Sequence, residues 1–112
     1  MALILTFKQP PIDLRFPSKY DFEQIDDLTY ELVSKANGEP ITSINESAFQ
    51  GYTSLESVVI PDSVISIQKD VFTECPSLKT VIIDGQTTEY LKKYFETNYP
   101  KIDLEFPDYL LK

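Results

Sequence analysis

Hydrophobic positions in the middle of the chain repeat with a period of 23 residues. Residues 41–63 align with residues 64–86 without a gap, and their apolar residues recur at this one offset. The identical pairs are Ser43/Ser66, Ile44/Ile67, Phe49/Phe72, Ser54/Ser77, Leu55/Leu78, Val58/Val81 and Ile60/Ile83. Units that carry the same apolar side chains at the same positions can stack them into one common core. The period predicts a short solenoid in which Phe49 touches Phe72.

Within each unit, an alternation of apolar residues predicts a β-strand. Val58 and Ile60 are apolar at alternate positions, and the second unit repeats the pair, which is typical of a strand with one buried face. The segment IDLEFP at 102–107 continues the 23-residue spacing and nearly repeats IDLRFP at 12–17. One strand per unit makes a parallel sheet. We therefore predict parallel strands, adjacent in this order, over 12–16, 55–60, 78–83 and 101–106.

Two further segments have apolar residues at helical spacing. The first, residues 18–37, places Phe22, Ile25, Leu28, Leu32 and Val33 on one face of a predicted N-terminal capping helix. The second, residues 87–99, places Tyr90, Leu91, Tyr94 and Phe95 on one face of a helix that Pro100 would end. Residues 2–7 predict one more strand at the edge of the sheet, beside 12–16 and of undetermined direction.

The chain has 112 residues, which is the size of one domain. We divide it into an N-terminal cap with strands and a helix (1–40), two repeats (41–86), and a degenerate third repeat with the C-terminal cap (87–112). The expected fold class is α/β. It is a short solenoid with a mainly parallel sheet, and helices cap it and cover one side.

The repeat I-T-S-I-x-x-x-A-F-x-G-x-x-S-L-x-S-V-x-I-P resembles the BspA-type leucine-rich repeat over residues 41–83. That family usually has glycine where this chain has Asn45 and Gln68, and cysteine where it has Tyr52. Glutamine adopts a left-handed backbone less readily than asparagine, so the second repeat is expected to be locally distorted. The resemblance implies a curved solenoid used for protein binding, often on microbial surfaces, and no catalysis.

Composition removes most catalytic chemistry. The chain has no His and one Cys, which excludes His-based catalysis, multi-Cys zinc sites and an internal disulfide. We therefore expect no enzyme, no cofactor and no metal site, and we interpret Cys75 as a core residue. The apolar run at the N-terminus is shorter than that of a signal peptide, and no stretch has the length of a membrane span. We expect a cytoplasmic protein without a membrane partner.

Charge is distributed unevenly. The net charge is −8, and residues 20–62 contain nine acidic residues and one basic residue. Such a chain is unsuited to direct contact with nucleic-acid phosphates. On the predicted helix, Glu23, Asp27 and Glu31 form a negative stripe at i, i+4 and i+8. The stripe is either a solvated face or a surface that attracts a basic partner.

The predicted sheet supplies a second candidate surface. Its outward residues form one row of Arg15, Val59, Ile82 and Glu105 and a second row of Asp13, Ser57, Thr80 and Asp103. A helix lying over Val59 and Ile82 would make them core residues, and the sequence leaves a covered and an open face as alternatives. The candidate partner-binding residues are Glu23, Asp27, Glu31, Arg15, Val59, Ile82 and Glu105.

Three functional hypotheses follow from these surfaces. The first is a non-enzymatic module that binds another protein, with self-association left open. The second is a small acidic inhibitor of a basic or nucleic-acid-binding protein, of the kind found among phage counter-defence proteins such as anti-CRISPRs. The third, which the family resemblance suggests, is an adhesin-like surface protein, and the expected lack of an export signal weakens it.

Overall fold

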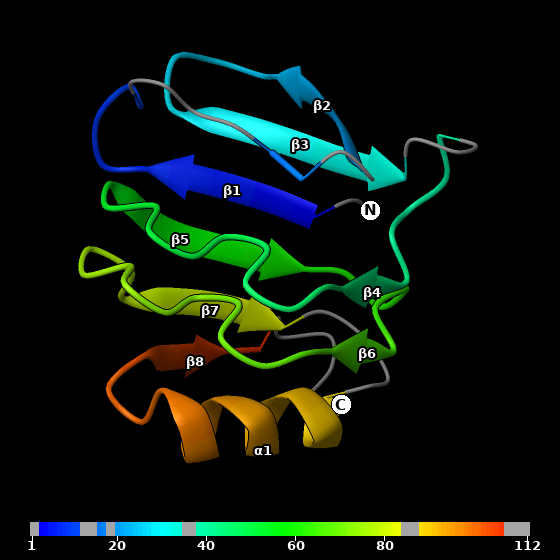
Figure 1. The fold of residues 1–112 in the computed structure, drawn as a ribbon, viewed down its shortest axis with the longest axis vertical. Coiled ribbons are helices and arrows are strands. Elements are labelled where there is room, and N and C mark those ends of the chain that lie inside the picture. The colour runs from blue at the N-terminus through cyan, green and yellow to red at the C-terminus, as the bar shows by residue number, and fades with distance from the viewer. Residues whose placement is uncertain (1–2, 12–15, 18–19, 35–37, 84–87, 107–112) are drawn as a thin grey trace.

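A computed structural model of the chain describes residues 3–11, 16–17, 20–34, 38–83 and 88–106. These residues form two sheets and one helix (Figure 1). The elements are β1 (Leu3–Phe7), β2 (Tyr20–Gln24), β3 (Thr29–Ser34), β4 (Ser43–Ile44), β5 (Leu55–Ile60), β6 (Ser66–Ile67), β7 (Thr80–Ile83), α1 (Thr88–Asn98) and β8 (Asp103–Glu105). The larger sheet has the strand order β2-β3-β1-β5-β7-β8, and β4 pairs with β6 in the smaller one.

The repeats pair in the register that the 23-residue period predicts. β5, β7 and β8 are parallel neighbours, with Val58 opposite Val81 and Val81 opposite Leu104. In the smaller sheet, Ser43 lies opposite Ser66. Val58 and Val81 are fully buried, because the alternation points them into the core. The parallel order of the strands at 55–60, 78–83 and 101–106 is therefore confirmed.

The predicted N-terminal helix over 18–37 is wrong. Residues 20–34 form an antiparallel hairpin of β2 and β3, with Tyr20 opposite Ser34. The segment Thr29–Ser34 is rich in β-branched and aromatic residues, which favour strands. In the turn, the Asp26 carboxylate accepts a hydrogen bond from the Leu28 amide at 2.8 Å, which closes a local loop instead of a helical turn.

Placing residues 2–7 at the edge of the sheet is also wrong. β1 lies between β3 and β5 and is antiparallel to both, so Leu5 pairs with Tyr30 on one side and Val58 on the other. The sheet is consequently mixed, not mainly parallel, with three antiparallel and two parallel pairings. β1 takes the place beside β5 that was predicted for 12–16, of which residues 12–15 lie outside the described part of the chain. Three apolar residues on the inner face of β1 make this central position favourable.

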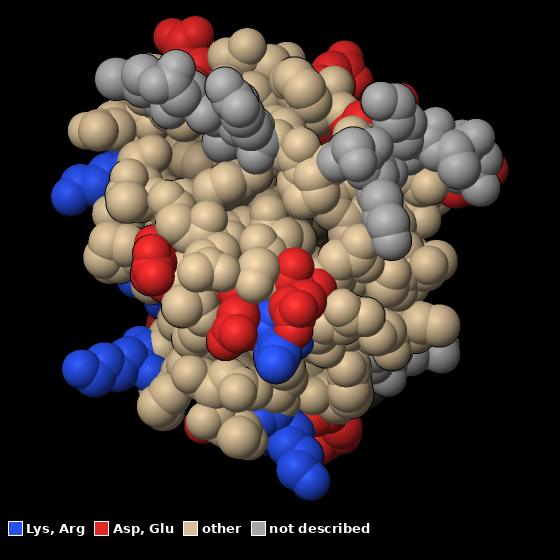
Figure 2. Space-filling model, viewed as in Figure 1, with Lys and Arg blue, Asp and Glu red and all other residues tan. Residues whose placement is uncertain are grey.

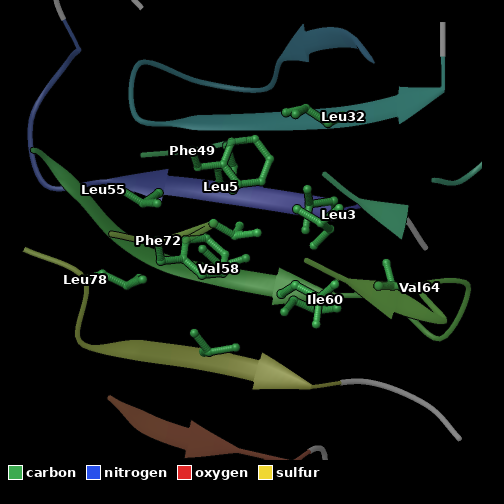
Figure 3. Close-up of a cluster of buried hydrophobic side chains, with 14 of the residues drawn as sticks. Leu3, Leu5, Leu32, Phe49, Leu55, Val58, Ile60, Val64, Phe72 and Leu78 are labelled. Atoms are coloured by element: carbon green, nitrogen blue, oxygen red, sulfur yellow. The ribbon is translucent and has the colours of Figure 1, made fainter. Parts of the chain in front are cut away.

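An aromatic ladder runs through the core at the same 23-residue interval. The ring centroids of Phe49 and Phe72 are 5.9 Å apart, and those of Phe72 and Phe95 are 5.8 Å apart, both in stacked geometry. The predicted contact between Phe49 and Phe72 is thus confirmed (Figure 3). The helix predicted over 87–99 is confirmed as α1, and its residues Leu91 and Phe95 are fully buried. The period therefore continues into α1, although a helix has replaced the short strand and turns.

Tyrosine hydroxyl groups close both sides of the β4–β6 pair. The Tyr20 hydroxyl donates to the Ser43 carbonyl at 3.0 Å and accepts from the Asn45 amide at 3.4 Å. At the other side, the Tyr90 hydroxyl donates to the Ile67 carbonyl and accepts from the Ile67 amide, at 3.1 and 3.0 Å. Each hydroxyl thereby satisfies backbone groups that another stacked strand would otherwise pair. Burial raises the pKa of Tyr20, in keeping with a neutral phenol in this position.

The described part of each repeat contains two residues with a left-handed backbone, at equivalent positions. These are Ser47 and Asp70 (φ 58° and 61°), and Gly51 and Glu74 (φ 82° and 61°). The expected distortion at Gln68 is wrong, because neither Asn45 nor Gln68 is among the residues with positive φ. Gln68 has another role, since its side-chain oxygen accepts a hydrogen bond from the Glu46 amide at 2.9 Å.

Replacing Glu74 with glycine is expected to raise the free energy of unfolding by about 0.5–1 kcal/mol, because a left-handed backbone strains residues with a Cβ atom. The opposite change at the equivalent position, Gly51→Ala, should lower it by about 1 kcal/mol. No heavy atom lies within 4 Å of a Cβ added at Gly51, so backbone strain is the only local cost there. Urea denaturation of both variants tests this, and a destabilised Glu74→Gly would contradict it.

Candidate interaction surface

The face of the six-stranded sheet turned away from the core is called here the outer face. The strand registers align one residue from each strand into a continuous row across it. The row consists of Glu23, Glu31, Ile4, Val59, Ile82 and Glu105. Paired residues on neighbouring strands point to the same side, so three adjacent apolar side chains have carboxylates at both ends. Ile4, Val59 and Ile82 are partly buried, as expected for side chains flanked by neighbouring strands.

A second row on the outer face consists of hydroxyl residues that end in a carboxylate. Its members are Thr29, Thr6, Ser57, Thr80 and Asp103. Ser57, Thr80 and Asp103 have the alignment predicted from the repeat, and Asp13 lies outside the described residues. The outer face thus combines an apolar row with a row of hydrogen-bonding groups, both of which can contact a ligand laid across the strands.

The structure brings together two groups of residues that the sequence placed on separate surfaces. Val59, Ile82 and Glu105 lie in one row as predicted, whereas Arg15 is outside the described residues. The stripe of acidic residues on a helix is wrong, because Glu23 and Glu31 are paired across two strands. Their position in the hairpin joins them to the row that contains Val59.

Asp27 is the third residue of the predicted stripe, and it lies exposed in the turn between β2 and β3. Its position at the tip of the hairpin separates it from the rows of the outer face. Its neighbour Asp26 has a lowered pKa, chiefly because its carboxylate accepts the hydrogen bond from the Leu28 amide. The role of the Asp26 carboxylate is therefore explained by the turn of the hairpin.

Sequence reasoning missed Ile4 and Thr6, which complete the two rows. They alternate with the buried Leu3, Leu5 and Phe7 in the segment LILTF. This alternation shows that β1 has a second face. Only the pairing of β1 with both β3 and β5 places that face beside Val59.

The outer face is acidic. The outward positions of the six strands contain five acidic residues, namely Asp21, Glu23, Glu31, Asp103 and Glu105, and no Lys or Arg. Glu56 lies at the register shift between β1 and β5, and its carboxylate is 3.6 Å from the Lys79 ammonium. Glu23 and Glu31 lie directly opposite one another, an arrangement of like charges that destabilises an antiparallel pair.

The other side of the molecule has a different charge pattern. Figure 2 views the chain from the side of β4 and β6, where lysines lie among the acidic residues. An ion pair on this side joins Lys69 and Glu46 at 3.4 Å. The concentration of negative charge without lysine in the strands therefore distinguishes the outer face.

Within the described residues, no helix covers the outer face. α1 packs into the core through Leu91 and Phe95, and it bonds to the β6 segment through its tyrosines, as with Tyr94 and the Gln68 carbonyl at 2.8 Å. Residues Val59 and Ile82 are not part of this core cluster. Of the two alternatives that the sequence left open, the described structure favours an open face.

Cys75, Tyr52 and Tyr94 are titratable groups that lie in the core or pack against it. The Cys75 thiol is buried and donates a hydrogen bond to the Phe49 carbonyl at 3.1 Å, which confirms it as a core residue. Burial raises its pKa, and it also raises the pKa values of Tyr52 and Tyr94. A thiol with a raised pKa is a poor nucleophile. Among the residues that the structure describes, no cluster of three potential metal ligands occurs.

Comparison with known proteins identifies one similarity. The family model described as the BspA type leucine-rich repeat region (6 copies) matches residues 18–111, which is most of the chain. No curated protein and no solved structure matches the chain. In the part of the chain described here, no helix has the length and apolar character needed to cross a membrane.

Proposed function

We propose that this chain, which belongs to the BspA-type leucine-rich repeat family, is a non-enzymatic module that binds another protein through its outer face. The observation that carries this proposal is the row in which Ile4, Val59 and Ile82 lie side by side between carboxylates. Apolar residues at the centre of a polar rim are typical of protein interfaces.

The charge of the outer face indicates the kind of partner. Acidic residues at both ends of the row would attract a protein that carries Lys or Arg around an apolar centre. The same residues would repel the phosphates of a nucleic acid. Charge would act mainly on the rate of association and on the choice of partner, while burial of the three apolar side chains would slow dissociation.

Ile82→Asp is expected to weaken partner binding at least about tenfold, because it places a carboxylate in the apolar centre. The partner is first captured from the native host and identified by mass spectrometry, and affinities are then measured with purified proteins. Ile65→Asp is the matched control, because Ile65 is 68% exposed beside β6 and away from the outer face. Equal affinities of the two variants, both folded by circular dichroism, would contradict the proposal.

A second candidate function is inhibition of a basic, nucleic-acid-binding protein by charge alone. It is supported by the facing carboxylates of Glu23 and Glu31 and by the exposed Asp27 in the turn of the same hairpin. Changing all three to Lys moves the net charge from −8 to −2, since each change adds two positive charges. If charge dominates, this variant should associate more slowly, and binding of the natural protein should weaken steeply with salt. Unchanged affinity in this variant would favour the apolar row instead.

A further inference from the structure

β2 forms one edge of the larger sheet. Among the described residues, β3 is the strand that pairs with it, in a continuous register without a bulge. The four residues from Asp21 to Gln24 are all exposed. Proteins protect such an edge with charged side chains, Pro or a bulge, and of these β2 has only the two carboxylates of Asp21 and Glu23. The edge is therefore able to receive a strand that carries basic residues.

The hydrogen bonds of the hairpin show which backbone groups face the open edge. The Ile25 amide donates to the Thr29 carbonyl at 2.8 Å, so the backbone amide and carbonyl groups of Ile25 point toward β3. In an antiparallel pair the direction of these backbone groups alternates from residue to residue, so those of Glu23 point toward β3 as well. The amide and carbonyl groups of Phe22 and Gln24 consequently point away from β3. On the same side, the Tyr20 amide donates to the Pro17 carbonyl at 3.1 Å, where the open part of the edge begins.

The side chains of the edge define the chemistry of a complementary strand. On the outer face, Glu23 lies opposite Glu31, and a Lys or Arg on an added strand would compensate this pair of like charges. On the inner face, Phe22 is 57% exposed although its ring centroid lies 4.9 Å from that of Phe16. An apolar side chain of the added strand would cover the exposed part of Phe22. The matching segment therefore alternates basic and apolar residues.

A second copy of the chain does not match this edge. If two copies of β2 paired antiparallel about Phe22, Asp21 of each copy would face Glu23 of the other. Four carboxylates would then lie on one face of the new pair, which like-charge repulsion disfavours. The charges favour a different protein as the source of the added strand.

We propose that the open edge of β2 binds an extended, basic segment of a partner protein as an additional β-strand. The proposal rests on the proposed function in one respect, namely that the chain binds a protein. The contact itself differs from the proposed interface in using the backbone of Phe22 and Gln24 instead of the apolar side chains of the outer face, and the two share only Glu23.

The probe is a synthetic peptide of about eight alternating Lys and Val residues, a usual strand length. Its addition should slow hydrogen exchange at the amides of Phe22 and Gln24. Gln24→Pro removes an edge amide while leaving the bonds to β3 intact, so it should weaken peptide binding about tenfold or more. Gln24→Thr is the matched control and should bind like the natural protein. Equal binding by these two variants would overturn the proposal.

Two further measurements distinguish binding at this edge from binding elsewhere on the molecule. Glu23→Lys should weaken the Lys/Val peptide and strengthen a Glu/Val peptide, because the sign of the facing charge is reversed. If the natural protein binds the Lys/Val and Glu/Val peptides equally well, the added strand need not be basic and this part of the proposal is wrong. Ile82→Asp should leave peptide binding unchanged, so failure at the outer face and failure at the edge are distinguishable. Formation of a dimer that Gln24→Pro abolishes would overturn the choice of a different protein.

Discussion

Replacement of Phe72 by alanine is expected to lower the free energy of unfolding by about 3–5 kcal/mol. Phe72 is the middle residue of the aromatic ladder and stacks on Phe49 and Phe95 at 5.9 and 5.8 Å. Its removal would leave a cavity between the two repeats and α1, and ring stacking would be lost on both sides. The loss is measured by urea denaturation followed by circular dichroism.

The control for this prediction is an aromatic residue with a different environment. Phe22→Ala removes the same side chain from the exposed edge, where the loss should be about 1 kcal/mol or less. Phe49→Ala should resemble Phe72→Ala, because Phe49 is fully buried in the same ladder. If Phe72→Ala and Phe49→Ala both cost less than about 1 kcal/mol, the ladder is not part of a packed core.

Ile4→Pro is expected to destabilise the protein by about 3 kcal/mol or more, because β1 lies in the centre of the sheet. Ile4 pairs with Glu31 on one side and Val59 on the other, so proline would remove a ladder hydrogen bond and leave its acceptor unpaired. The connection between the hairpin and the repeats would weaken as well. Thermal and urea denaturation measure the change.

Two variants control for the side chain and for proline itself. Ile4→Thr keeps the backbone amide and the β-branched shape, and it should cost far less than Ile4→Pro. Gln24→Pro places proline on the open edge of β2, where the effect should stay within about 0.5 kcal/mol. Similar losses for Ile4→Pro and Gln24→Pro would mean that β1 is an edge strand, as the sequence pattern alone predicts.

The hairpin shows why local pattern was insufficient at the N-terminus. Apolar residues at 22, 25, 28, 32 and 33 fit one face of a helix, while Phe22, Tyr30 and Leu32 also fit the inner face of two paired strands. A short amphipathic segment satisfies either period, and partner strands decide between them. Here the partner is β1, whose pairing with β3 stabilises the extended form of this segment. The helix would have buried Ile25, which is instead 54% exposed.

The sequence by itself determined the part of the fold that repeats. The 23-residue period predicted the alignment of Val59 with Ile82, because equivalent positions in stacked units occupy the same place in a parallel register. It also predicted the contact of Phe49 with Phe72, and α1 was recognisable from its own helical spacing. Local spacing and repetition can be read directly from the order of the residues, so these features could be predicted without knowledge of contacts between distant parts of the chain.

Only the tertiary structure decided where β1 lies and what the outer face contains. β1 is antiparallel to β5, with Ile4 beside Val59, although about 50 residues of chain separate the two strands. This pairing joins Glu23 and Glu31 to the apolar row, and it makes β2 an edge. Repetition contains no information on such a contact, because β1 belongs to no repeat. Its position follows from burial of its inner side chains against both β3 and β5, which is a property of the assembled core.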